Sequence, residues 1–276
     1  MRITPFLFVI ALVTVADARA QYYYKDIVSN RQSLEEIARL KDQKIHSISI
    51  KSFEDDGSPS DGFFCERKIS KNYTSAETLT KSNVTGSSIF TSTFSKNGQL
   101  VKTVDSSEIA SSTSDYSYDD NGRVTAIRSS VRSSDDDFTN EIVEEHVYRY
   151  NEKGILLKMI RVKNFTDSST ILFSLDEKNN IAIEKDSKTG GTFYYYYDTK
   201  NRLTDVVHLN QFNQKMLPDY VFEYNSAGLI TQMTTTEEGG SYYYIWKYTY
   251  DNSLRSSENC YSKERRLMGR IAYEYK

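Results

Sequence analysis

The sequence is dominated by one short phrase that recurs along most of its length, and its clearest copy is YSYDDNGRV, which starts at Tyr116. Tyr116 and Tyr118 share one face of a strand because side chains alternate with a period of two. Asp119 then opens a turn, and Gly122 stands where a three-residue loop closed by a glycine bulge needs a positive φ. In such a loop Tyr118 pairs with Val124. The phrase therefore predicts one β-hairpin.

Other copies keep a glycine four places after the second aromatic residue, or replace it with asparagine, which also tolerates a left-handed backbone. The turn positions expected to adopt this conformation are Gly98, Gly122, Gly154, Asn179, Asn201 and Gly228. The reference positions of the copies fall at 94, 118, 150, 175, 197, 224, 250 and 275, so that successive copies are 22 to 32 residues apart. This spacing predicts a repeat architecture.

The phrase Y-x-Y-D-x-x-G-R-[LV] resembles the YD repeat of RHS-type secreted and surface proteins of bacteria. The resemblance covers about residues 86–276. It implies an exported bacterial β-repeat protein associated with cell surfaces and carbohydrate contact. We expect no toxin domain and no self-cleaving core, because the sequence lacks the proline- and aspartate-bearing segment at which those large proteins cleave themselves.

The two strands of each unit carry different patterns. The first strands keep aromatic residues on one face, whereas the second strands carry aliphatic residues spaced by three, such as Val124 and Ile127, or Leu203 and Val206. Because three is odd, such a pair shares a face only across a bulge; otherwise both faces are partly covered. We favour the bulge, since polar residues fill most of the other positions.

The predicted fold class is all-β, with one short N-terminal helix. We expect a long antiparallel meander of repeated hairpins, some sixteen strands, in a strongly curled or twisted sheet. A half-pipe or barrel-like form would enclose the aromatic face of the sheet. A long twisted ribbon with the helix at one end is the alternative.

The first 85 residues do not follow the repeat. Residues 1–20 resemble a secretory signal peptide, with a basic start, an apolar run and a small-residue cleavage site between Ala20 and Gln21. We therefore expect a periplasmic or extracellular protein. Residues 21–85 are expected to form an N-terminal cap, followed by the repeat domain at 86–276.

Within the expected cap, Tyr22–Tyr24 are assigned to a first short strand. Ser33 with Glu36 forms a capping-box signature, which predicts a helix near residues 33–42. This helix would cover apolar surface at one end of the sheet. Cys65 and Cys260 are the only cysteines, and either a disulfide or two free thiols fits the sequence.

Residue types that carry chemistry form no recognisable constellation. The sequence has no G-x-S-x-G or H-E-x-x-H motif, and its three histidines lie in different units without metal-ligand spacing. The acidic clusters are Asp55–Asp56, Asp119–Asp120 and Asp135–Asp137. Their spacing does not match an EF-hand calcium loop. We expect no enzyme activity, no metal and no cofactor. A net charge of −3 gives no basic surface for nucleic acid.

We therefore expect a non-enzymatic binding or structural protein of the bacterial envelope or exterior, with glycans or envelope proteins as partners. The aromatic residues expected to contact a ligand are opposite in parity to the aromatic face and are Tyr194, Tyr196 and Tyr243. One alternative is an outer-membrane-type β-barrel, which the polar second strands and the mean hydropathy of −0.60 oppose. The other is an accessory remnant of an RHS-type toxin system.

Overall fold

The computed structural model describes residues 21–134, 141–210, 213–237 and 242–276 and contains one antiparallel sheet of 18 strands. The proposed signal peptide and the cluster Asp135–Asp137 lie outside the described residues. The strands are β1 (Ser47–Phe53), β2 (Phe64–Ile69), β3 (Ser75–Ser82), β4 (Gly86–Phe94), β5 (Leu100–Ser107), β6 (Ala110–Tyr118), β7 (Val124–Ser133), β8 (Glu141–Tyr150), β9 (Leu156–Lys163), β10 (Asp167–Leu175), β11 (Ile181–Asp186), β12 (Thr192–Tyr197), β13 (Leu203–Leu209), β14 (Met216–Tyr224), β15 (Ile230–Thr236), β16 (Tyr243–Asp251), β17 (Leu254–Ser262) and β18 (Leu267–Tyr275).

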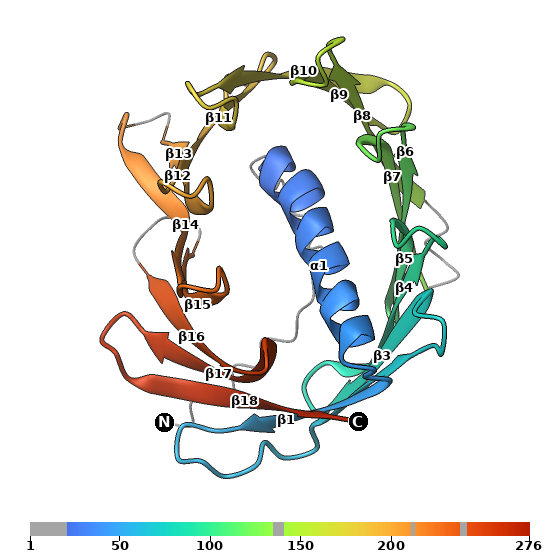
Figure 1. The fold of residues 1–276 in the computed structure, drawn as a ribbon, viewed down its shortest axis with the longest axis vertical. Helices are drawn as coiled ribbons and strands as arrows, with labels where there is room; N and C mark the ends of the chain where they lie inside the picture. The colour runs from blue at the N-terminus through green and yellow to red at the C-terminus, as the bar shows by residue number, and fades with distance from the viewer. Residues whose placement is uncertain (1–20, 135–140, 211–212, 238–241) are drawn as a thin grey trace.

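Each strand pairs with its neighbours in sequence, and β1 also pairs with β18, so the sheet closes into a barrel (Figure 1). The closing register runs from Ile48 opposite Tyr275 to Phe53 opposite Arg270. The all-β meander predicted from the repeat is confirmed. The closure also decides between the half-pipe and the barrel, and it leaves the sheet without a free edge. Strands β1 to β3, from the expected N-terminal cap, belong to the same sheet.

The hairpin predicted from the central phrase has the expected geometry. Tyr118 pairs with Val124, Asp119 N donates to Arg123 O at 3.0 Å, and Gly122 N donates to Asp119 O at 2.9 Å. The register shift beside Tyr118 leaves Thr125 as an extra residue in β7. This bulge turns Val124 and Ile127 to the same face. The backbone has positive φ at Gly98, Gly122, Gly154, Asn179, Asn201 and Gly228.

The hydroxyl of the second tyrosine in a unit reaches the preceding unit. It donates to a carbonyl in the first two residues of the bulged strand, directly after the previous turn. The bonds are Tyr118 to Leu100 (2.7 Å), Tyr150 to Val124 (2.9 Å), Tyr197 to Ile181 (2.9 Å), Tyr224 to Leu203 (2.6 Å), Tyr250 to Ile230 (2.7 Å) and Tyr275 to Arg255 (2.7 Å). Six of the eight copies are therefore each bonded to the copy before them.

The N-terminal segment is helical and lies inside the barrel (Figure 1). It consists of a π-helix, η1 (Tyr23–Val28), continued by α1 (Ser29–Asp42). Two predictions are wrong here. The tyrosines at 22–24 are not a strand, and Ser33 is not an N-cap, because the helix begins before it and the Ser33 hydroxyl donates to Ser29 O at 3.0 Å.

The surroundings of these tyrosines explain the helical conformation. Consecutive residues of a helix point in successive directions around its axis, and inside a barrel every direction meets a wall. Tyr22 packs edge-on to His146 at 4.8 Å between ring centroids, and Tyr23 packs on Tyr195 at 5.2 Å. Tyr24 reaches a third part of the wall, the rings of Tyr220 and Phe222 on β14. A strand would have offered only two directions.

Two adjoining clusters of apolar side chains fill the interior of the barrel. Around η1 the wall contributes buried residues from β7 to β14, such as Met159 and Val206. Around α1, Ile37 and Leu40 pack with residues of β1 to β5 and β17. The helix therefore lies in the core of the sheet, rather than covering one end of it as expected.

The outer face of the barrel carries many charged side chains, beside exposed apolar ones such as Leu157 and Leu172. Asp115 points outward because its neighbour Tyr116 packs into the core. On β5 to β8 four charged residues of alternating sign stand opposite one another: Lys102, Asp115, Arg128 and Glu145. The side chains of Lys102 and Asp115 are 46% and 58% exposed, with Nζ and Oδ1 3.8 Å apart. No helix in the described residues is long and apolar enough to span a bilayer.

Cys65 on β2 and Cys260 on β17 are separate free thiols, which excludes the disulfide alternative in this structure. Cys65 is buried, and its Sγ lies 3.5 Å from Thr80 Oγ1.

Candidate functional site

Glu184 on β11 anchors the beginning of the internal helix. Its side chain is 1% exposed and accepts three hydrogen bonds, from Tyr22 N (3.0 Å), Tyr23 N (2.9 Å) and the Tyr195 hydroxyl (2.7 Å). A carboxylate at this position satisfies amides that a helix start leaves unpaired and complements its dipole. Burial raises the pKa of Glu184 to about 7 despite these donors, and the charge of Asp26 acts in the same direction.

The sequence did contain a signal for this anchor. Ile181 and Glu184 have the three-residue spacing of the aliphatic pairs, and the bulge beside Leu175 turns both inward. Glu184 therefore stands where other units have an apolar residue such as Ile127. An acid at an inward repeat position marks a polar contact in the core, which the aliphatic spacing alone did not reveal.

A second polar cluster joins η1 to β8. Asp26 Oδ2 lies 2.6 Å from His146 Nδ1 and accepts from the Tyr148 hydroxyl at 2.6 Å, while His146 Nε2 lies 2.8 Å from Glu144 Oε1. Burial by itself lowers the pKa of His146, but the two carboxylates outweigh it and raise this pKa to about 9. His146 is thus a charged link between helix and wall.

The other end of the helix is held by a third polar group. Arg67 Nη1 on β2 lies 2.8 Å from Glu36 Oε1 on α1. Nearby, Arg255 and Glu258 occupy another three-residue pair on β17; their side chains are 2.8 Å apart, and the Tyr273 hydroxyl donates to Glu258. The helix is therefore attached to the wall by polar contacts along its length as well as by packing.

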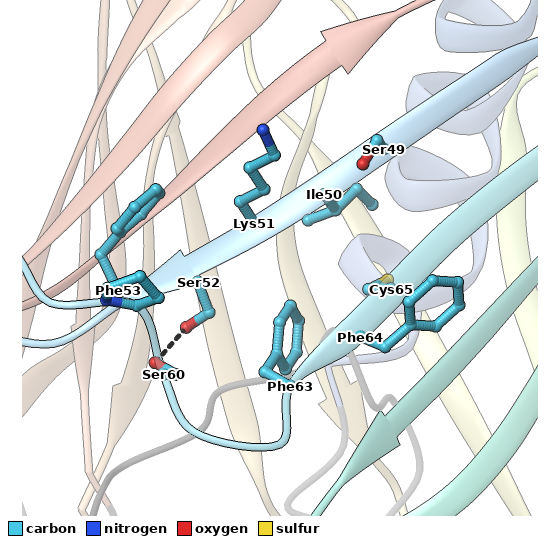
Figure 2. A pocket seen from close by; sticks show the side chains of 10 residues that line it. Ser49, Ile50, Lys51, Ser52, Phe53, Ser60, Phe63, Phe64 and Cys65 are labelled. Atoms are coloured by element: carbon cyan, nitrogen blue, oxygen red, sulfur yellow. Dashed lines mark hydrogen bonds between the residues drawn. The ribbon is translucent and has the colours of Figure 1, made fainter.

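A cleft of about 490 Å³ lies at the barrel rim, where the loop between β1 and β2 folds back. Figure 2 shows the rings of Phe53 and Phe63 on either side of the hydrogen bond between Ser52 Oγ and Ser60 Oγ, which is 2.9 Å long. Phe64, at the start of β2, is 47% exposed. Lys51 also lines the cleft and pairs with Glu274 on β18. The cleft therefore combines rings, hydroxyls and one ammonium group.

The predicted ligand-contacting tyrosines lie elsewhere. Tyr194 and Tyr196 are on the outer face of β12, and Tyr243 is at the start of β16, with Tyr196 48% and Tyr243 37% exposed. Three strands separate β12 from β16, a span of about 19 Å at the usual spacing between strands. The structure does not bring these tyrosines into one patch. The cleft was missed because a loop, and not the repeat, brings its residues together.

The titratable groups found in the sequence have structural partners. Asp119 Oδ1 accepts from Asn121 N and Arg123 N, at 3.0 and 2.9 Å, which is turn chemistry. His46 contacts Tyr73, whereas His208 contacts Asp219. In the part of the chain that the structure describes, no three His, Cys, Asp or Glu residues are grouped to hold a metal.

The fold and the polar contacts define a class of protein: a closed antiparallel β-barrel that encloses its own N-terminal helix. No known protein family matches the sequence, and no curated relative does.

Among solved structures, a porin-like protein from Bacteroides uniformis is similar over 84% of this chain and 98% of its own, with 10% identity and a TM-score of 0.40. The structure of TcdB2-TccC3 is similar over 86% of this chain, with 11% identity and a TM-score of 0.30, and the match spans only 17% of that chain. At these TM-scores neither similarity is evidence for the fold or the function of this protein. The barrel assignment therefore rests on the strand pairing.

Proposed function

We propose that this protein is an exported, non-enzymatic binding protein of the bacterial envelope or exterior, built as a barrel whose outer face contacts water. The observation that carries the proposal is the distribution of polarity. The aromatic and aliphatic side chains of the two core clusters pack around the helix, whereas charged side chains such as Lys102 and Asp115 point outward. A barrel for lipid surroundings needs the reverse on its outer face.

Because the interior is filled, we place the ligand site on the outside of the barrel. The helix packs against wall residues from β1 to β14 and β17, so the barrel encloses its own chain. The rim cleft is a concave site lined by aromatic rings, of which Phe64 is exposed. Aromatic rings stack on the apolar faces of sugars, and serine hydroxyls bond to sugar hydroxyls. We propose a carbohydrate ligand at the cleft formed by Phe53, Phe63, Phe64 and Ser60.

A glycan array with the mature protein tests this proposal. We expect a retained glycan, and we expect Phe63→Ala with Phe64→Ala to weaken its binding at least tenfold, since stacked rings contribute about 1.4 kcal/mol or more together. Tyr196→Ala is the matched control, because it removes an exposed ring outside the cleft. Absence of any retained glycan, or equal binding by both variants, contradicts the proposal.

An outer-membrane barrel is the second candidate, favoured by the closed meander of 18 strands. Cell fractionation separates the two. Lipid contact would place the charges of Lys102, Arg128 and their neighbours in hydrocarbon, at about 2–4 kcal/mol for each basic residue near the midplane. We therefore expect the protein in the aqueous periplasmic or medium fraction. Release from membranes only by detergent would favour the second candidate.

A further inference from the structure

Glu184 is a buried acid with no positively charged partner among the residues that the structure describes. Its three hydrogen-bond donors are two backbone amides and a hydroxyl, all uncharged. The charged residue that acts on it most is another acid, Asp26, which is itself shared with His146. Arg161, on β9, engages the Tyr22 hydroxyl and Asp167 instead. Buried charges in proteins are generally paired, so we expect a cation beside Glu184.

Gln21 directly precedes Tyr22, whose amide bonds to Glu184. It is 7% exposed, and its carbonyl accepts from Lys25 N at 2.8 Å, so it belongs to the first helical turn. The nitrogens of the first turn point together toward the helix start, where Tyr22 N and Tyr23 N already meet Glu184. Gln21 Oε1 is buried and has no hydrogen-bond partner among the described residues. Among the described residues, Gln21 Oε1 therefore lacks a hydrogen-bond donor, and Glu184 lacks a cation.

We propose that the α-amino group of Gln21, freed when residues 1–20 are removed, is the cation that pairs with Glu184. This inference rests on the signal peptide cleavage that the proposed function includes. In the uncleaved chain the nitrogen of Gln21 is a neutral amide. Hydrolysis of the bond between Ala20 and Gln21 adds one water: Ala20 leaves as a carboxylate, and the amine of Gln21 takes up a proton.

The pairing gives each of the acids Asp26 and Glu184 a cation beside it. His146 is protonated between Asp26 and Glu144, and the ammonium group of Gln21 offsets Glu184. An ammonium has three donors, so after bonding Glu184 it retains donors for Gln21 Oε1. Cleavage of the leader would thus complete the anchor that holds the helix inside the barrel.

A competing reaction makes the inference decidable. A free N-terminal glutamine cyclises when its amine attacks the side-chain Cδ and ammonia leaves, which gives a neutral lactam. A protonated amine held by Glu184 has no lone pair for this attack. We therefore expect Gln21 to remain uncyclised in the folded protein purified from the envelope or medium fraction.

The first measurement is the intact mass with N-terminal sequencing. A chain that begins with an open Gln21 supports the inference, whereas a mass lower by one ammonia overturns it. A chain that keeps residues 1–20, or begins elsewhere, refutes the cleavage proposal and the inference with it. The N-terminal sequence distinguishes that result from cyclisation.

The second measurement is a double-mutant cycle on stability in denaturant. One change acetylates the α-amino group, and the other is Glu184→Gln. We expect acetylation to lower the ratio of folded to unfolded protein about tenfold or more with Glu184 present, because a buried charge loses its partner, and less than twofold in the Glu184→Gln variant.

The matched control for the cycle is Glu223→Gln, which removes an outer-face acid that is bonded to Gln232. Acetylation should act on this variant as it does on the unchanged protein. Equal losses in the Glu184→Gln variant and in the unchanged protein would overturn the inference. If Glu184→Gln does not fold, the state of Gln21 in the mass measurement still decides.

Discussion

At the scale of single residues, the ring and the hydroxyl of the repeated tyrosine have separate functions. The rings pack in the barrel, whereas the hydroxyls of six units bond to a carbonyl at the first or second residue of the previous unit's bulged strand. A bulge disrupts the ladder locally, and a side-chain donor at that point gives the carbonyl a partner. This explains why the second aromatic position of these units is tyrosine and not phenylalanine.

We predict that Tyr224→Phe lowers the free energy of unfolding by about 1 kcal/mol, because the Leu203 carbonyl loses its hydroxyl donor at 2.6 Å while the ring remains. Urea denaturation measures the change. Tyr196→Phe, on the outer face, should change stability by less than about 0.5 kcal/mol. An unchanged midpoint for Tyr224→Phe would show that the hydroxyl contributes nothing.

His146 predicts a pH dependence of stability. Its folded pKa, about 9, lies above the ordinary value of 6.5, so the folded state holds this proton more tightly than the unfolded state. The stabilisation is complete below pH 6.5 and is lost as the pH rises through 9, by about 3 kcal/mol at most.

Urea denaturation at pH 6.5 and at pH 9 measures this loss. We expect His146→Gln to be less stable at the lower pH and to show a smaller decline between the two. His46→Gln, at an exposed site near the rim, is the matched control and should keep the decline. The same decline in the His146→Gln variant would contradict the assignment.

At the scale of elements, the internal helix acts as the core of the barrel. A sheet closed around 18 strands leaves a space that its own side chains do not fill, and the segment η1 with α1 supplies the missing apolar surface. The polar anchors at Glu184, His146 and Arg67 set the position of the helix along this space. Apolar residues therefore pack the helix against the wall, whereas polar residues set its position along the barrel.

We predict that Leu40→Ala lowers the free energy of unfolding by about 2–5 kcal/mol, because Leu40 is 1% exposed and its removal leaves a cavity between α1 and the wall. Lys41→Ala, on the exposed side of the same turn, should cost less than about 0.5 kcal/mol. Thermal or urea unfolding of the two variants measures the difference. Equal effects would show that α1 is not part of the core.

At the scale of the whole molecule, the pairing of β1 with β18 joins the two ends of the repeat array. Ala272 lies in the middle of this seam, opposite Lys51 on one side and Ser257 on the other. Closure protects the backbone edges of the first and last strands, and it keeps the helix enclosed.

We predict that Ala272→Pro opens this seam, since proline removes a ladder donor and is poorly tolerated within a sheet, at about 3 kcal/mol or more. Limited proteolysis should then cut within α1, and we expect no cut there in the unchanged protein. Ser58→Pro, in the loop between β1 and β2, is the control and should leave α1 protected. Protection of α1 in both variants would show that closure does not enclose the helix.

The sequence by itself determined the hairpin, its turn, the bulge and the meander, because these follow from contacts between residues close in the chain. These local features are the alternation of Tyr116 and Tyr118, the turn at Asp119 and Gly122, and the three-residue spacing. Each depends only on residues within one hairpin. They also predicted that the sheet curls around its aromatic face.

The tertiary structure alone decided that the sheet closes, that Tyr22 and its neighbours are helical, and that Glu184 binds the start of that helix. Closure depends on the twist accumulated over all the strands, and not on any one of them. The helix is favoured because only inside a closed wall do tyrosines pointing in three directions all become buried. Partners 162 residues apart, such as Tyr22 and Glu184, leave no periodic trace in the sequence.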